Sequence, residues 1–407
     1  MPIVERVVKI GEPLTVEDAV AVARHKAIVE LAPSAWERMR ASERALQQLL
    51  AANQGVYGLN TGLGDLIRKT LPPDQLLQFQ RNVLMSHSTG VGEACPEEVA
   101  RAMMLLMAHG LAQGCSGIRP EVVQTLVDLL NRGVTPWMPL KGSVGYLVGP
   151  AHVGLVMMGL GKAFVDGRLV AGHEALGAKG IAPVTFGPKE ALALINGTYE
   201  ITAFGILALH DAQVVTLNAD VTAAMSMEAL RATDRWLDER VLALRPHRGQ
   251  QVTGANLRRL LAGSEIIAQA RGARIQDALS LRCVPQVHGA VRDLLAYVRQ
   301  ALETELNAVT DNPVLVPVEA GAVEVLVSGN GHGAPVAVAM DLLSLAMGQL
   351  SSITERRIDR LTNRHVSGLP EFLVARPGIN SGVMLAQYAA AALAAETKAL
   401  AHPSSLD

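Results

Sequence analysis

The chain has 407 residues with a formal net charge of −2, and its charges of both signs are interspersed, so nucleic acid and membrane surfaces are not expected as partners. Hydrophobic residues make up 49% but aromatic residues only 3%, a composition typical of close-packed helices with small contact side chains. Three cysteines without CxxC spacing and eleven scattered histidines exclude a disulfide framework and a metal site. No apolar leader follows Met1, which predicts a soluble cytoplasmic protein.

Helical spacing of apolar residues recurs through the first half of the chain. A glycine-rich loop is predicted at Gly55–Gly64, and the apolar stretch Val144–Leu160 is predicted to be a buried helix and its approach. Short β-prone segments, such as Ala322–Val327, are too few to form a core sheet. The helices predicted in this half are Thr15–Leu31, Ser34–Ala52, Pro73–His87, Pro96–Gln113 and Pro120–Asn131.

The second half is dominated by helical runs that exceed the average helix of about 11–12 residues. Helices of such length bury their apolar faces best side by side, so the fold class predicted is all-α with a long central bundle. We expect an N-terminal helical and loop-bearing domain at residues 1–200 and the long-helix bundle at residues 201–407. The long helices predicted are Thr198–Ala232, Val287–Asn307, Pro335–Thr362 and Ser381–Leu400.

Polar and glycine-rich blocks between these helices are the candidates for chemistry. Tyr57 stands in the loop VYGLNTGLG, His87 in SHSTGVGE, and Arg282 in SLRC. Taken singly, each has an ordinary structural explanation: a tyrosine that packs, a histidine that caps a helix, and an arginine in a structural ion pair. Arginine also suits a two-pronged grip on a carboxylate, which keeps a binding role open for Arg282.

The order of the blocks narrows these possibilities. The blocks YGLNTGLG, SHSTGVGE, SGIR, LKGSVG, LINGT, QDxxSLRCxPQ, TDNP, ERRI, SGLPEFLV and GINSGVMLAQ resemble the aromatic amino acid ammonia-lyases, and histidine ammonia-lyases in particular. The resemblance runs from about Ala19 to Asp407. It implies an all-α ammonia-lyase/fumarase-like fold, a homotetramer and active sites that gather loops from several subunits.

The resemblance also implies roles for individual residues. Tyr57 would be the active-site base or proton shuttle, Arg282 would hold the substrate carboxylate, and Asn196 would hydrogen-bond near the reacting amino acid group. A carboxylate held by an arginine fork and a phenol placed among donors are physically suited to these roles. The residues that match the substrate pocket of the family are His87, Gln276 and Asn330.

One departure from the family pattern falls on the cofactor. These lyases make an electrophilic ring, the MIO cofactor, by cyclising an internal Ala-Ser-Gly that follows GSVG. Here Gly145 of GSVG is followed at once by Tyr146, so both residues mark the position of the missing triad. Leu279, Gly331 and Ala334 replace the tyrosine, aromatic residue and glutamate that accompany the cofactor in the family. We therefore expect no cofactor. The chain also stops before the family's C-terminal helical tail.

These features predict a carbon–nitrogen lyase that eliminates an amine from a histidine-like amino acid or betaine without MIO. Trimethylamine release from a histidine betaine, the reaction of the family relative ergothionase, is the most specific form of this hypothesis. Two alternatives stay open: an ordinary MIO-dependent ammonia-lyase whose fused residue is missing from the sequence, and a non-catalytic homologue. The expected ligand in the catalytic cases is a small amino acid-like molecule.

Overall fold

The computed structural model describes residues 6–51, 58–66, 68–318 and 323–406. Packing divides the chain into two compact units: unit 1, Met1–Leu207 with Leu302–Val336, and unit 2, Ala208–Ala301 with Ala337–Asp407. The boundary falls inside three long helices, α9 (Tyr199–Ala229), α14 (Val284–Leu306) and α15 (Ala334–Thr362). Residues 302–336 belong to unit 1 with the N-terminal residues, whereas the division predicted at residue 200 assigns them to the bundle. That predicted domain division stays a prediction.

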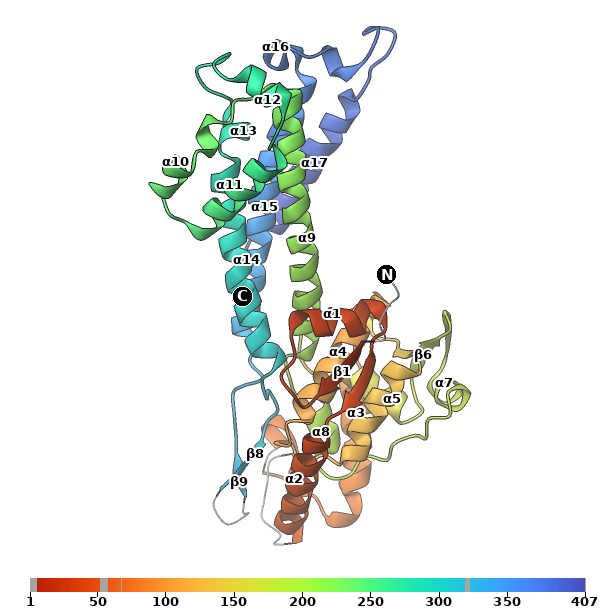
Figure 1. Cartoon of the computed structure of the whole chain (residues 1–407). Helices are drawn as coiled ribbons and strands as arrows, with labels where there is room; N and C mark the ends of the chain where they lie inside the picture. The colour runs from red at the N-terminus through yellow and green to blue at the C-terminus, as the bar shows by residue number, and fades with distance from the viewer. Residues whose placement is uncertain (1–5, 52–57, 67, 319–322, 407) are drawn as a thin grey trace. The chain divides into compact units, whose positions relative to one another are not determined.

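Unit 1 is built around one helix that is buried on every side. In α4 (Glu97–Leu111) all residues from Val99 to Leu111 are buried, as expected of a helix that is apolar around its whole circumference. Helix α1 packs on α4, α4 packs on α5, and α3 packs on both α6 and α8 (Figure 1). The remaining helices of the unit are α1 (Val16–His25), α2 (Pro33–Ala51), α3 (Leu76–His87), α5 (Pro120–Asn131), α6 (Val148–Met157), α7 (Gly172–Ala178) and α8 (Glu190–Ile195), with 3-10 turns η1 (Gly64–Leu66) and η2 (Pro73–Gln75).

The strands of unit 1 form small sheets at the margins of the helices, with the orders β1-β2, β3-β5, β4-β6-β7 and β8-β9. Among the strand pairs of the described residues, only β1–β2 is parallel. None of these sheets forms a layer of the core, which agrees with the prediction that the β-prone segments do not build a core sheet. The strands are β1 (Val7–Ile10), β2 (Ile28–Leu31), β3 (Val91–Ala94), β4 (Val134–Pro136), β5 (Pro139–Lys141), β6 (Lys162–Val165), β7 (Arg168–Ala171), β8 (Val314–Pro317) and β9 (Val323–Leu326).

The predicted helix Thr15–Leu31 is wrong in its second half. Helix α1 ends at His25, because Lys26 adopts the left-handed conformation (φ 54°) that closes a helix C-terminus. The next residues form β2, in which buried and exposed side chains alternate and Val29 pairs with Val8 of β1. The apolar alternation of a four-residue strand is too short to be distinguished from one turn of a helical pattern.

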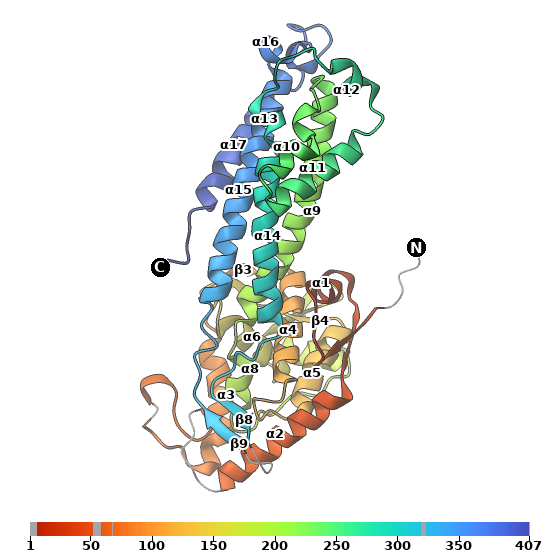
Figure 2. The ribbon, with the colours of Figure 1, turned by 60° about the vertical axis from the view of Figure 1, so that its left-hand side comes forward.

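Unit 2 is a bundle of long helices. The unit 2 portions of α9, α14 and α15 run side by side with α17 (Met384–Leu400) in both views (Figures 1 and 2). A core cluster that includes Met227, Leu257, Leu281 and Ile353 joins α9, α14 and α15 to the shorter helices. The shorter elements are η3 (Arg235–Leu237), α10 (Glu239–Ala243), α11 (Arg248–Leu260), α12 (Glu265–Ala270), α13 (Leu279–Arg282), α16 (Arg364–Ser367) and η5 (Glu371–Leu373).

The predicted all-α class is confirmed by this architecture. Helix α5 has the bounds predicted for it, and the four long helices differ from their predicted bounds by a few residues. By length and composition alone, the helical stretches Glu190–Ala229 and Ala334–Thr362 could also cross a membrane, a test that core helices of soluble proteins pass as well. The prediction of no membrane partner therefore still rests on the sequence.

Candidate active site

The segment between β5 and α6 carries the departure noted in the sequence. Ser143 organises this loop: its hydroxyl oxygen accepts hydrogen bonds from the backbone N–H of Gly145 (2.9 Å) and of Tyr146 (3.2 Å), and its hydroxyl donates to Oε2 of Glu200 (2.9 Å). Gly145 has φ +79°, and a Cβ atom there would lie 1.8 Å from Cγ2 of Ile201. Only glycine fits this position, both by conformation and by space.

The loop closes in a strained turn immediately after Tyr146. Leu147 has φ 71° and ψ −50°, and the N–H of Val148 donates to the carbonyl oxygen of Tyr146 (2.9 Å). This is a γ-turn with a positive φ at its central residue, a rare conformation that costs free energy for any residue with a side chain. The turn and the Ser143 hydrogen bonds together fix the backbone that carries Tyr146.

The Tyr146 side chain is tied to a predicted site residue. Its hydroxyl donates to Oδ1 of Asn196 at 2.7 Å. Asn196 is 4% exposed and directly follows α8, and its Nδ2 donates to the carbonyl oxygen of Asn312 (2.7 Å). Neighbouring Asp311 forms a buried ion pair with Lys189, with an Nζ–Oδ2 distance of 2.6 Å. The Asn196 amide is therefore held on both sides, and its Oδ1 faces the phenol.

A glycine makes room for this phenol. A Cβ atom on Gly331 would lie 2.8 Å from the Tyr146 hydroxyl oxygen and 2.9 Å from Cε2 of its ring, so the ring rests against the bare backbone of residue 331. Asn330, a predicted pocket residue, directly precedes Gly331 in this loop. It is exposed, and its Nδ2 donates to the carbonyl oxygen of Val309 (3.2 Å). Asn330, Tyr146 and Asn196 thus belong to one neighbourhood in unit 1.

His87 lies at the edge of the same region. It is the last residue of α3, it is half-buried, and its Nδ1 lies 2.7 Å from the carbonyl oxygen of Val83. Because a carbonyl can only accept, Nδ1 carries a proton, and in the neutral ring Nε2 is left as an acceptor. The chain after His87 forms β3, which pairs with β5, and β5 leads directly into the Tyr146 loop.

Tyr57, the predicted base, lies outside the described residues. The residue after it, Gly58, has φ +67°, and a Cβ atom there would lie 2.0 Å from Cδ2 of Leu192. Leu192 belongs to α8, one turn before Asn196. The described end of the glycine-rich loop therefore packs closely against the helix that leads to Asn196.

The other two predicted residues belong to unit 2. Arg282 is the last residue of α13 and is half-buried; within the described part of the chain its Nε is buried and has no hydrogen-bond partner. Gln276 is exposed in the segment before α13. An unpaired guanidinium nitrogen is costly to bury, which is compatible with a ligand carboxylate at Arg282. The predicted convergence of Tyr57, Asn196 and Arg282 stays a prediction.

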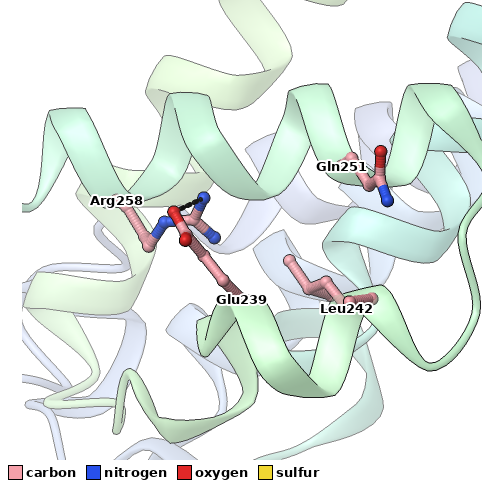
Figure 3. A pocket seen from close by; sticks show the side chains of 5 residues that line it. Glu239, Leu242, Gln251 and Arg258 are labelled. Atoms are coloured by element: carbon pink, nitrogen blue, oxygen red, sulfur yellow. Dashed lines mark hydrogen bonds and ion pairs between the residues drawn. The ribbon is translucent and has the colours of Figure 1, made fainter.

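Two surface pockets of unit 2 hold none of the predicted residues. Figure 3 shows the smaller, of about 230 Å³, where Arg258 donates to Oε1 of Glu239 (2.8 Å) beside Leu242 and Gln251. A larger neighbouring pocket of about 700 Å³ shares Arg258 and contains the ion pair of Arg271 with Asp234. In both pockets, therefore, the charged side chains named here are paired with one another.

The sequence-based reasoning missed Glu200, which anchors the Tyr146 loop. Its carboxylate accepts from Ser143 and from the N–H of Gly149 (3.3 Å), and it is 6% exposed. Burial raises the pKa of Glu200, although these two hydrogen bonds act in the opposite direction. A carboxylate in the first turn of a long apolar helix was the signal that could have identified it, since a buried acid requires partners. Among the described residues no cluster of three metal-binding side chains occurs.

Comparison with known proteins identifies the family. The model of the aromatic amino acid lyase family matches residues 14–407. The histidine ammonia-lyase of Symbiobacterium thermophilum is 48% identical over 403 residues, which cover 98% of this chain and 79% of that protein. The structure of histidine ammonia-lyase from Trypanosoma cruzi is 40% identical with a TM-score of 0.91, covering 99% of this chain and 76% of that one. Ergothionase from Treponema denticola, an ergothioneine-degrading enzyme, is 28% identical with a TM-score of 0.92, covering 98% and 81%. The chain therefore belongs to the aromatic amino acid lyase family and is a carbon–nitrogen lyase.

Proposed function

We propose that this lyase eliminates an amine from a histidine-like amino acid or betaine without the MIO cofactor. The observation that carries the proposal is that Tyr146 directly follows Gly145, the last residue of the GSVG block, with no residues between them. No Ala-Ser-Gly occurs anywhere in the 407 residues, so the chain offers no triad to cyclise.

The local structure supports the same view. The residues where the triad would stand form the γ-turn at Leu147, and the phenol of Tyr146 lies between Asn196 and Gly331. The hydroxyl of Ser143 is engaged with Glu200 and two backbone N–H groups, so Ser143 does not substitute for the missing serine. The residues present therefore do not fit the MIO ring.

Elimination without an electrophile restricts the leaving group. A primary ammonium group carries N–H protons that a base removes more readily than a proton on the β-carbon, and the resulting amine is a poor leaving group. A quaternary ammonium group has no N–H proton and departs directly as a neutral tertiary amine. A betaine of histidine, or its thiol derivative, is therefore the most specific substrate that we propose, and trimethylamine the expected product.

In this reaction Tyr57 is proposed to remove the β-proton. The electrons of the C–H bond form a double bond between the α- and β-carbons, and those of the C–N bond leave with the tertiary amine. Arg282 is proposed to hold the substrate carboxylate, and Nε2 of His87 to accept a hydrogen bond from an azole ring. The unpaired Nε of Arg282 within the described residues and the Nδ1–Val83 contact of His87 support these roles.

We also propose that the protein works in the cytoplasm as a homotetramer, without nucleic acid, membrane or metal. The assembly is supported by apolar side chains that unit 2 leaves exposed on two helices, since large exposed apolar surfaces mark association sites. These side chains are Val214, Val215, Leu217, Val221 and Met225 on α9 and Leu385, Tyr388, Leu393 and Leu400 on α17.

Removal of ammonia from histidine is the second candidate function. The observation that favours it is the 48% identity to a histidine ammonia-lyase. This candidate requires a cofactor residue that the sequence does not contain, and the intact mass of the purified protein distinguishes the two cases: it matches the sequence if no fused residue is present.

The deciding experiment offers the protein L-histidine and its N,N,N-trimethyl betaine in parallel. We expect trimethylamine, with near-ultraviolet absorbance of the conjugated acid, from the betaine only. Ammonia from histidine without trimethylamine from the betaine would refute the proposal, and no product from either would favour a non-catalytic homologue. Arg282→Lys should lower kcat/KM about 30-fold because the two-pronged carboxylate grip is lost. Arg240→Lys, at a side chain that is 89% exposed, is the matched control.

A further inference from the structure

We propose that Tyr146 is the specificity-determining residue of this lyase and makes the site select a quaternary ammonium group over a primary one. The inference rests on the proposed function, because it assumes that the nitrogen of the substrate lies near Asn196. It assigns two separate tasks to one side chain: the hydroxyl occupies an acceptor, and the ring offers a surface to a cation.

The first step concerns the acceptor. A primary ammonium group needs hydrogen-bond acceptors, and Oδ1 of Asn196 is the side-chain acceptor expected beside the substrate nitrogen. The Tyr146 hydroxyl donates to this oxygen at 2.7 Å. The amide cannot turn to present a different atom, because its Nδ2 donates to Asn312 and lies 3.4 Å from Oδ1 of Asp311. Tyr146 thus takes one of the two lone pairs of this oxygen and competes with a primary ammonium group for it.

The second step concerns the position of the ring. Three features hold it: the hydrogen bond to Asn196, the contact with the bare backbone of Gly331, and the strained turn at Leu147. The Tyr146 side chain is nevertheless half-buried rather than enclosed. A ring that is fixed and partly exposed can contact a ligand without losing conformational freedom on binding, which favours affinity.

The third step concerns the charges nearby. Asp311 is neutralised by Lys189, and the carboxylate of Glu200 is satisfied by Ser143 and Gly149. Neither carboxylate is therefore available as the counter-ion of a substrate cation. An aromatic face attracts a quaternary ammonium group through its negative charge density and contacts the methyl groups, and this interaction needs no hydrogen bond. The ring of Tyr146 and a quaternary nitrogen are complementary in this respect.

The test measures binding rather than turnover. Dissociation constants for L-histidine and its N,N,N-trimethyl betaine are determined by calorimetry in the full chain with Tyr57→Phe, which the role proposed for Tyr57 predicts to be inactive. Into this background we introduce Tyr146→Phe, which keeps the ring and frees Asn196, and Tyr146→Leu, which keeps apolar bulk and removes the ring. Tyr297→Phe, on a tyrosine that is 49% exposed, is the matched control.

We expect the betaine to bind about tenfold more tightly than histidine when Tyr146 is present. Tyr146→Phe should strengthen histidine binding about threefold to tenfold and leave betaine binding within about twofold. Tyr146→Leu, which removes the hydroxyl as well as the ring, should weaken betaine binding about tenfold and strengthen histidine binding about threefold to tenfold. Equal weakening of both ligands by Tyr146→Leu would overturn the proposal, because it would reveal a structural role.

If Tyr146→Leu does not fold, as judged by thermal melting, Gly331→Ala provides the second test. The added methyl group would displace the ring without removing it. Selective loss of betaine binding supports the proposal, and unchanged binding of both ligands overturns it. Failure of the proposed function is recognised separately, by the absence of trimethylamine release from the wild-type protein, and does not alter the ratio of the two dissociation constants.

Discussion

Two regions of this lyase bury polar groups, and they differ in backbone strain and in the exposure of their central side chain. In unit 2, Asp220 accepts from His288 (2.8 Å), from Asn256 (2.8 Å) and from Arg292 (2.5 Å), and Arg357 lies 3.4 Å from the far nitrogen of His288. These residues come from four different helices of the bundle. The network is closed: a carboxylate and its surrounding donors satisfy one another.

The Tyr146 loop in unit 1 is arranged differently. It contains a residue with a side chain in a strained turn, and it depends on glycine at positions 145 and 331 for space. Its central phenol is half-buried. The comparison suggests that closed networks such as that of Asp220 support the fold, whereas strain and partial exposure mark the place where a ligand completes the structure.

The largest effect is expected from breaking the closed network. Asp220→Ala would leave the Arg292 and Arg357 guanidinium groups without their buried counter-ion, and we expect the free energy of unfolding to fall by about 3–5 kcal/mol in urea titrations. Asp166→Asn is the control, because the Lys179–Asp166 pair is at the surface, its carboxylate side chain is 78% exposed, and asparagine tolerates the positive φ (50°) of this residue. That change should cost less than about 0.5 kcal/mol. Similar losses for both variants would show that closure of the network does not matter.

Unit 1 also contains a buried, fully hydrogen-bonded side chain, His109. It tests whether such pairing stabilises the fold in unit 1 as it does in unit 2. Nδ1 of His109 accepts from the N–H of Gly11 (3.1 Å), so Nε2 carries the proton and faces Oδ1 of Asn307 (3.2 Å). Burial lowers the pKa of His109 from 6.5 to about 4, with the Asn307 hydrogen bond acting in the opposite direction. The ring is therefore neutral at pH 7.

The depressed pKa of His109 sets the sign of a pH dependence. Below pH 6.5 the unfolded chain takes up a proton at this histidine that the folded chain refuses, so stability is full above pH 6.5 and falls until about pH 4. His109 should account for about 3 kcal/mol of that loss. His109→Gln should remove this share, measured as the difference in unfolding free energy between pH 7 and pH 4 in both proteins. Parallel pH curves for the two would contradict the prediction.

Helices could be predicted from the sequence because their signal extends over several turns. The helix predicted at Pro120–Asn131 has the bounds of α5. The long helices could be predicted because apolar residues recur at helical spacing over their whole length. Strand β2 could not be predicted, because it is defined by its parallel partner β1 and by the left-handed Lys26. Long-range pairing leaves little trace in a four-residue segment.

The candidate site was only partly accessible to sequence reasoning. Asn196 and Tyr146 were each identified from motifs, but their hydrogen bond is a property of the fold. Tyr146 and Gly331 were recognised as separate departures from the family pattern, whereas the structure places the ring of one on the backbone of the other. The anchoring role of Glu200 depends on Ser143, which is far away in the sequence, and no local pattern reveals such a pairing.

The smallest change in stability is expected from substitutions in the strained turn at Leu147, and it tests the comparison most directly. Leu147→Gly should raise the free energy of unfolding by up to about 1 kcal/mol, because relief of the positive φ outweighs the greater freedom of glycine in the unfolded chain. Leu147→Ala keeps the strain while it shortens the side chain, so it serves as the matched control. Urea titrations of both variants separate lost side-chain contacts from relieved strain.

The same substitution should weaken function while it increases stability. A relaxed turn no longer fixes the ring of Tyr146, so the ratio of betaine to histidine binding should fall in Leu147→Gly and be retained in Leu147→Ala, the opposite order from their stabilities. If Leu147→Gly were no more stable than Leu147→Ala, the turn would store no strain, and the distinction between a closed structural network and a strained ligand site would not hold for this loop.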